Sequence, residues 1–400
     1  MADNWVKRLR GRGVRKDLGA GLVHGLVSVP DGLAAGILAG VNPVAGLYGY
    51  LFGTVAGAVS TSSVFMSVQA TGAMAALIAD VPQVRSGPDA TAALATLGVL
   101  TGISMLVLGI LRLGSLVRFV PNAVLVGFVN AVAINIAIGQ LGGLTGFTAE
   151  ESGGGRVGRL VSTFANVMAW SWPTVAVSAT TIALILLLER TRLGTLSLFV
   201  AVAVSSGLTA LLGLDGVALI RDIAEVPAGL PLPVLPSLSL VPELVIPALS
   251  LTFVGLVQGA AISQSVPNPN GRYPDVSGDF RGQGIANIAA GLLRGVPVGG
   301  SMSGTAVLTA AGAQSRHANL TAGVVMAITV LLFSDLVGYI ATPALAALLV
   351  LIGSRMFKLE QILMVWRTGR TLAARTDAAG LGVSHQQHLP EERGQLLGRG

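Results

Sequence analysis

Long apolar stretches recur along nearly the whole chain, with too few charged residues to cover the surface of a soluble protein. Only 11% of the 400 residues are charged, whereas an ordinary soluble domain carries roughly 25%. A helix of about 20 apolar residues crosses the hydrocarbon core of a bilayer. The sequence therefore predicts an all-α protein that crosses the lipid bilayer many times.

The apolar segments number about twelve, counted by length and hydropathy. They run at roughly 18–40, 47–61, 68–80, 93–112, 122–141, 172–189, 194–213, 244–264, 283–293, 303–313, 319–333 and 337–353. The third and the tenth are too short to span a bilayer. Each of these two follows a stretch rich in Gly, Ser and Thr instead of a clean loop.

Basic residues gather in the N-terminal arm and in the loops that follow even-numbered segments, whereas the other loops are mixed or acidic. This distribution is the positive-inside pattern with a cytoplasmic N-terminus. We expect a multi-pass protein of a bacterial inner (plasma) membrane. The net charge of +6 is then explained by topology, and we expect no nucleic-acid partner.

The two short segments are the strongest indication of a binding site. Each has a short β-capable approach, a Gly/Ser/Thr turn and a short helix, and such pairs point to the binding site of a transporter. If the two belong to inverted repeats, their helix N-termini meet at the membrane midplane, where unpaired N–H groups bind an anion without any lysine. The alternative is that these small residues serve only close helix packing.

The residues expected to bind substrate come from these two segments and from the eighth. They are Gln69, Ala70, Thr71, Gly72, Gln258, Ser301, Met302, Ser303, Gly304 and Thr305. The side chain of Gln258 either faces the site or bonds across to a neighbouring helix.

A carboxylate lies within the first apolar segment. Asp31 follows Pro30 with apolar residues on both sides, and an ionisable group in such a place is by default functional. We expect it to couple transport to protons. The alternative is a Pro-Asp-Gly turn at the membrane surface with a hydrated aspartate. His24 could share the proton path, although a buried and satisfied histidine is the simpler expectation.

Enzyme chemistry finds no support in the sequence. Cysteine is absent and the four histidines are scattered, so we expect no catalytic residue, no metal site and no cofactor. The pair His385 and His388 lies in a polar tail, where histidines are usually solvated. No HExxH, GxSxG or P-loop motif occurs.

Two stretches carry a resemblance to a known family. Residues 28–48 read SVPDGLAAGILAGVNPVAGLY, and residues 282–307 read GQGIANIAAGLLRGVPVGGSMSGTAV. Both resemble signatures of the sulfate permease (SulP) anion transporters, and the resemblance extends over roughly 15–370. It implies a 7+7 inverted-repeat fold in which a core domain rocks against a gate domain. It also implies short β approaches to half-helices 3 and 10, substrate between those half-helices, and a homodimer.

The resemblance divides the chain into five parts. They are a cytoplasmic basic arm (1–17), a first inverted repeat with segments 1–7 (18–213), a proline-rich connection (214–243), an incomplete second repeat with segments 8–12 (244–370) and a polar, disordered tail (371–400). The last two helices and the STAS domain of the family are not found, so we expect either a truncated or frame-altered product or a tail that replaces them.

Three site positions depart from the family pattern. By position, Asp31 stands where relatives have a glutamine, and Gln258 stands where many have an acidic residue. This exchange puts a sodium site on the eighth helix in doubt. Gly304 replaces a basic residue of animal relatives, so the site would depend more on helix dipoles.

The expected function is secondary active transport of a small anion (sulfate, bicarbonate or a dicarboxylate), coupled to protons by symport through alternating access. Two alternatives remain open. One is a passive anion channel or an exchanger, and the other is a nucleobase-type transporter of the same fold.

Overall fold

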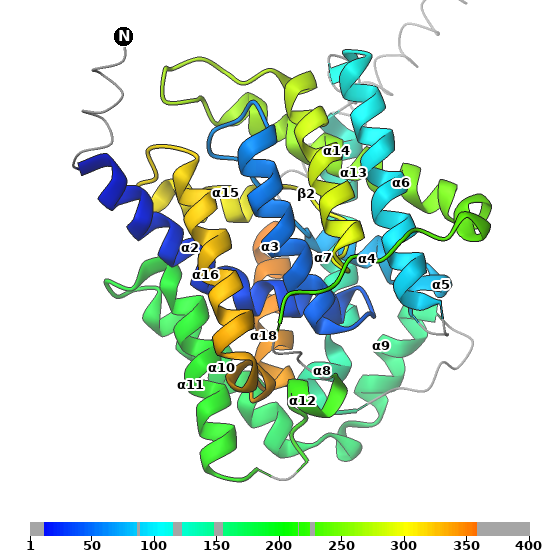
Figure 1. Cartoon of the computed structure of the whole chain (residues 1–400). Coiled ribbons are helices and arrows are strands. Elements are labelled where there is room, and N and C mark those ends of the chain that lie inside the picture. The colour runs from blue at the N-terminus through cyan, green and yellow to red at the C-terminus, as the bar shows by residue number, and fades with distance from the viewer. Residues whose placement is uncertain are drawn as a thin grey trace, which may run out of the picture.

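The computed structural model describes residues 12–85, 89–114, 122–147, 155–214, 216–224 and 229–357. Most of these residues are helical, and a single two-stranded sheet lies inside the bundle (Figure 1). The all-helical prediction is confirmed. The expected tail 371–400, the end of the second repeat at 358–370 and most of the basic arm lie outside the described residues.

The described residues of the first half of the chain form ten helices, some long and some of only one or two turns, and one strand. They are α2 (Arg12–Leu38), α3 (Pro43–Ser60), β1 (Ser67–Gln69), α4 (Gly72–Ile78), α5 (Pro82–Arg85), α6 (Ala90–Ile110), α7 (Asn122–Gly139), α8 (Leu141–Thr145), α9 (Gly155–Ala165), α10 (Trp172–Leu188) and α11 (Ser197–Leu211).

The second half repeats this order of long helices, short strand and short helix. Its elements are α12 (Ile220–Ile223), α13 (Val241–Ser265), α14 (Val276–Leu292), β2 (Gly299–Ser301), α15 (Met302–Ala310), α16 (His317–Leu332), α17 (Ser334–Gly338) and α18 (Thr342–Met356). Three 3₁₀ turns lie between helices, at Val167–Ala169, Gly194–Leu196 and Leu238–Leu240.

Each of the twelve expected segments coincides with a helix, but several boundaries differ. Within the described residues, four helices are long and apolar enough to cross a membrane: Gly13–Leu38, Ala90–Ile110, Gly194–Leu211 and Leu238–Ser265. Helix α2 begins at Arg12, inside the expected arm, and α14 begins at Val276 instead of near 283. Hydropathy did not detect the early start of α14, because its first turns are polar although they are buried.

The two short segments pair with each other. Strands β1 and β2 are antiparallel, with Ser67 opposite Ser301 and Gln69 opposite Gly299. Strand pairing satisfies backbone N–H and C=O groups that cannot bond to water inside a bilayer. Helix α4 begins three residues after the end of β1, and α15 begins directly after β2. Because the strands are antiparallel, the two helices follow opposite ends of the sheet.

The helices divide into two groups by their contacts. The core group contains α2, α3, α4, α6, α13, α14, α15 and α16, and the gate group contains α7, α8, α10, α11 and α18. Within the core group, α6 and α14 approach closely because glycines face each other. A Cβ added at Gly102 would lie 2.6 Å from the carbonyl oxygen of Gly284. Most of the gate group lies in the lower half of Figure 1.

One buried carboxylate joins three parts of the core group. Asp279, at the start of α14, is fully buried. It accepts hydrogen bonds from the Ser62 hydroxyl at 2.8 Å, from both the backbone and the hydroxyl of Ser63 at 2.7 and 2.5 Å, and from the Ser263 hydroxyl at 2.6 Å. These bonds hold the loop before β1 against α13 and α14.

Replacing this carboxylate should destabilise the core group. Asp279→Asn places an NH₂ donor among groups that already donate, so we expect a loss of about 2–3 kcal/mol, as for a hydrogen-bonded charged group. The thermal midpoint of the purified protein in detergent measures it. The exposed Asp335 provides the control, because Asp335→Asn should leave the midpoint unchanged; an equal shift in both variants would contradict the structural role.

Candidate functional site

The paired strands bring the two N-caps of the short helices into one region. Thr71 caps α4 by accepting a hydrogen bond from the Met74 backbone N–H at 3.3 Å. Ser301 caps α15 by accepting one from the Gly304 backbone N–H at 3.0 Å. Serine and threonine favour this position because a short side-chain oxygen reaches the unpaired N–H groups of the first turn.

Gln69, the last residue of β1, lies at the centre of a buried polar cluster that includes His24 and Ser28 of α2. Its amide nitrogen donates to the Ser28 hydroxyl at 2.9 Å and lies 3.3 Å from His24 Nε2. The same His24 nitrogen lies 2.8 Å from the Ser67 hydroxyl. His24 Nδ1 forms no hydrogen bond with the described residues. The expectation of a buried histidine is therefore confirmed, but its bonding is only half satisfied.

Gln258 connects α13 to the end of β1. The Thr71 hydroxyl donates to Gln258 Oε1 at 2.9 Å. The predicted bond across to a neighbouring segment is therefore present. The amide nitrogen of Gln258 forms no hydrogen bond within the part of the chain that the structure describes, so it can donate to a ligand.

The predicted residues of α15 differ in what their polar groups do. Thr305 accepts from the Ser67 backbone N–H at 3.1 Å and donates to the Ser301 carbonyl at 2.7 Å. Its hydroxyl therefore holds α15 to β1. Ser303 is exposed and its hydroxyl lies 3.2 Å from that of Ser301, while Met302 is 57% exposed.

The small residues at the helix starts are explained by close contacts. A Cβ at Gly72 would lie 2.7 Å from Ile136 Cδ1 on α7, so this glycine lets the gate group approach α4. A Cβ at Gly304 would lie 2.4 Å from Gln69 Oε1. Ala70, which directly follows β1, is also buried. Gly304 thus makes room for Gln69, a contact that no sequence pattern indicated.

Asp31 lies inside a continuous helix. Helix α2 runs through Pro30 without a break, so the alternative of a Pro-Asp-Gly turn at the membrane surface is wrong. Asp31 is half-buried and accepts a hydrogen bond from the Tyr50 hydroxyl at 2.7 Å. Among the described residues, no arginine or lysine forms an ion pair with it.

Sequence reasoning did not identify Ser28, Ser67 or Tyr50. A signal for one of them existed, because His24, Ser28 and Asp31 are spaced by four and three residues and so share one face of α2. The partners Ser67 and Tyr50 come from other elements. Only the tertiary contacts reveal them.

This site offers neutral donors instead of fixed cations. The donors are the Gln258 amide, the Ser303 hydroxyl and the first backbone N–H groups of α15, which carry the positive end of a helix dipole. Groups of three or more potential metal ligands are absent from the described residues. A small ligand rich in oxygen atoms matches such a set.

Comparison with known proteins gives one consistent result. A family model described as the sulfate permease family matches residues 14–373. A protein of Mycobacterium tuberculosis named as a probable sulfate transporter is 30% identical over 383 residues, which are 93% of this chain and 67% of the relative. The bicarbonate transporter BicA of Picosynechococcus is 25% identical over 87% of this chain and 62% of its own length.

Solved structures share the fold. The transmembrane domain of the cyanobacterial BicA superimposes with a TM-score of 0.78 at 22% identity, covering 89% of this chain and 94% of that domain. Murine Slc26a9, solved in an inward-facing state, gives a TM-score of 0.82 at 20% identity, covering 91% of this chain and 64% of that one. The 7+7 inverted-repeat prediction is thereby confirmed as a fold. The chain spans about two thirds of the length of the curated relatives named above.

The contact between Gly304 and Gln69 can be tested directly. In Gly304→Ala the new methyl group must displace the amide of Gln69. If this site binds an oxyanion such as sulfate, we expect that binding to weaken by up to about tenfold, the value of one hydrogen bond. Sulfate-dependent thermal stabilisation measures it. Without sulfate, we expect a loss of stability of about 1–3 kcal/mol, because the displaced amide loses its hydrogen bond to the Ser28 hydroxyl inside a buried cluster.

Gly207→Ala in α11 is the matched control, since no atom lies within 4 Å of its added Cβ. Equal sulfate stabilisation in both variants and in the parent protein would show that Gln69 plays no part in binding.

Proposed function

The chain belongs to the sulfate permease family, and we propose that it is a secondary active transporter of a small oxyanion, coupled to protons. The observation that carries the proposal is the junction of β1, β2 and α13. There the Thr71 hydroxyl bonds Gln258 and the Ser303 hydroxyl lies beside that of Ser301, and the Gln258 amide and the Ser303 hydroxyl are the uncharged donors proposed to meet the anion. Sulfate, bicarbonate and dicarboxylates have several acceptor oxygens that such donors fit.

The absence of fixed cations supports transport more than storage. A ligand that is carried must bind and also leave, so moderate affinity is an advantage. Hydroxyl and amide donors hold an oxyanion without the strong attraction of a buried arginine. Among the residues of β1, β2, α4 and α15, none is basic.

Asp31 is the proposed proton-coupling group. It is an ionisable side chain on a membrane helix, on the same face as two residues of the Gln69 cluster. Intramembrane carboxylates of this kind mark proton pathways in transporters. Protonation of Asp31 would remove a negative charge beside the path of the anion and so favour its entry.

The division into a core group and a gate group supports alternating access. The proposed substrate residues belong to the core group, and α7 of the gate group contacts α4 at Gly72. Movement of one group against the other would open the site to either side. We propose a homodimer in a bacterial inner membrane with a cytoplasmic N-terminus, which is the orientation that the basic loops favour.

The first experiment is uptake into proteoliposomes of labelled sulfate, bicarbonate and fumarate, with and without an inward proton gradient. We expect the gradient to accelerate uptake of one of these anions. Asp31→Asn should reduce uptake to the rate without a gradient, because the variant cannot take up a proton. Asp335→Asn, at an exposed carboxylate, should behave as the parent protein.

The result also separates the alternatives. Uptake that never exceeds equilibrium and ignores the gradient would indicate a channel or an exchanger and would overturn symport. Uptake of a nucleobase but of no anion would indicate the nucleobase-type function. Gradient-driven uptake that survives Asp31→Asn would remove this carboxylate from the mechanism.

Gln258 allows an independent check of the site. Gln258→Leu removes the amide donor and leaves the Thr71 hydroxyl without its acceptor, so we expect anion uptake to fall at least tenfold, by about 1.4 kcal/mol or more of lost binding. Gln83, which bonds Glu243 at the surface, provides the control as Gln83→Leu. Unchanged uptake in Gln258→Leu would place the substrate elsewhere.

A further inference from the structure

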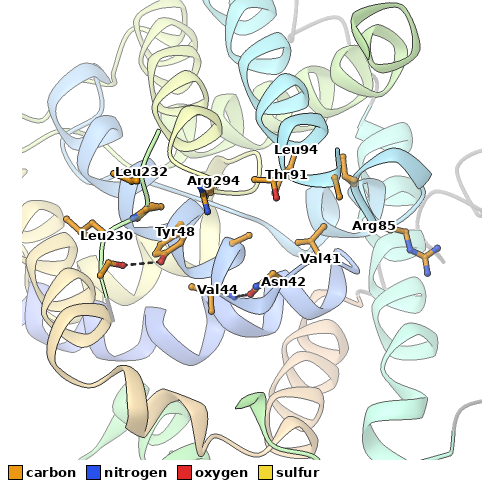
Figure 2. Close-up of a pocket in the computed structure, with 15 residues that line it drawn as sticks. Val41, Asn42, Val44, Tyr48, Arg85, Thr91, Leu94, Leu230, Leu232 and Arg294 are labelled. Atoms are coloured by element: carbon orange, nitrogen blue, oxygen red, sulfur yellow. Dashed lines mark hydrogen bonds between the residues drawn. The ribbon is translucent and has the colours of Figure 1, made fainter. Parts of the chain in front are cut away.

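A second region of the core group has the form of a binding site. A cavity of about 650 Å³ lies where the turn between α2 and α3, the start of α6, and residues 229–232 meet (Figure 2). The Tyr48 hydroxyl donates to the Gly229 carbonyl at 3.2 Å and thereby holds 229–232 over the cavity. We call it the arginine pocket, after Arg85 and Arg294 in its lining.

The arginine pocket is positively charged. Figure 2 shows Arg294 near its middle, between Tyr48 and Thr91, and Arg85 at its edge. No carboxylate lines the described pocket, and neither arginine forms an ion pair with a described residue. The remaining wall is largely apolar, which strengthens the attraction between Arg294 and an anion.

The backbone at Arg294 adds an independent observation. Its φ of 58° lies in the left-handed region, at the end of α14 where helices usually have glycine. An arginine there costs backbone free energy that a glycine would not. Arg112 ends α6 with the same φ, so what distinguishes Arg294 is that its side chain lines the pocket.

The arginine pocket is separate from the site between the half-helices. Its turn residues follow the C-terminal end of α2, whose last residue, Leu38, lies about 10 Å beyond Asp31 at about 1.5 Å per helical residue. That end is opposite the N-terminus of α2. With α2 as a membrane span, the turn residues of the pocket lie toward the face opposite its N-terminus.

We propose that the arginine pocket is a second anion site that collects small oxyanions at the membrane face opposite the N-terminus and supplies them to the central site. The choice of oxyanions rests on the proposed transport function. A cleft that is lined by charges of one sign and has low-dielectric walls raises the local concentration of the oppositely charged ion. It thereby accelerates the association of that ion with the protein. Arg294 binds the anion, with the Thr91 hydroxyl beside it.

Binding is measured first, by equilibrium dialysis of the purified full chain against labelled sulfate or fumarate. We expect two sites in the parent protein and the loss of one in Arg294→Gly, which also relieves the backbone. Arg294→Lys should keep both sites. Arg112 is the matched control, because its φ is also 58° and it ends α6 far from the pocket; Arg112→Gly should keep both sites.

Transport kinetics test the supply role. With substrate on the pocket side, Arg294→Gly should raise KM about tenfold at low ionic strength and leave the maximal rate unchanged, and the difference should shrink at high salt. With substrate on the other side, KM should not change. An unchanged KM on both sides, or an equal rise in Arg112→Gly, would overturn the supply role.

The outcomes distinguish this proposal from the proposed function. Loss of a site in Arg294→Gly but not in Gln258→Leu would support the arginine pocket and contradict the central site. One site that only Gln258→Leu removes would overturn the arginine pocket. Repeating dialysis after adding a phospholipid with a phosphate headgroup identifies the natural source: competition with sulfate at the Arg294 site would assign the pocket to lipid and overturn supply of a free anion.

Discussion

The pairing of β1 with β2 is the interaction on which the rest of the core group depends. Two extended segments inside a bilayer would leave N–H and C=O groups without water, which costs several kcal/mol for each group. The strands satisfy each other, and side chains from the surrounding helices satisfy what remains. Gln283 Oε1 accepts from the Gly300 N–H at 2.9 Å, and Asn287 bonds both the N–H and the carbonyl of Val298. The buried polar residues of α14 are explained by this demand.

The same pairing determines how closely the helices pack. A Cβ at Gly300 would lie 2.7 Å from Gly259 Cα, and one at Gly299 would lie 3.0 Å from Gly255 Cα. Glycines on the strand and on α13 therefore meet backbone to backbone. This close approach brings Gln258 within hydrogen-bond distance of Thr71. The candidate site is thus a product of packing around the sheet, and its polar groups are divided between structural bonds and groups that can bind a ligand.

Charge is distributed in accordance with the two proposed sites. Neutral donors surround the mid-membrane position, where a fixed cation would bind an anion too tightly for release. The arginines of the pocket lie at the membrane face, where hydration and salt weaken attraction to a level that suits capture. Asp31, with Tyr50 as its hydrogen-bond donor, lies on α2 between these two regions.

The sequence alone determined the membrane class, the number and order of the apolar helices and the two short segments at 68–80 and 303–313, because hydropathy, helix length and glycine content are local properties. It also indicated Asp31 and Gln258, since isolated polar residues in apolar segments stand out. Only the tertiary structure decided which polar groups are used. The hydroxyl of Thr305, a predicted substrate residue, holds α15 to β1, and Gly304 makes room for Gln69. The early start of α14 at Val276, the partners of His24 and the arginine pocket depend on contacts between residues far apart in the chain, which no local pattern contains.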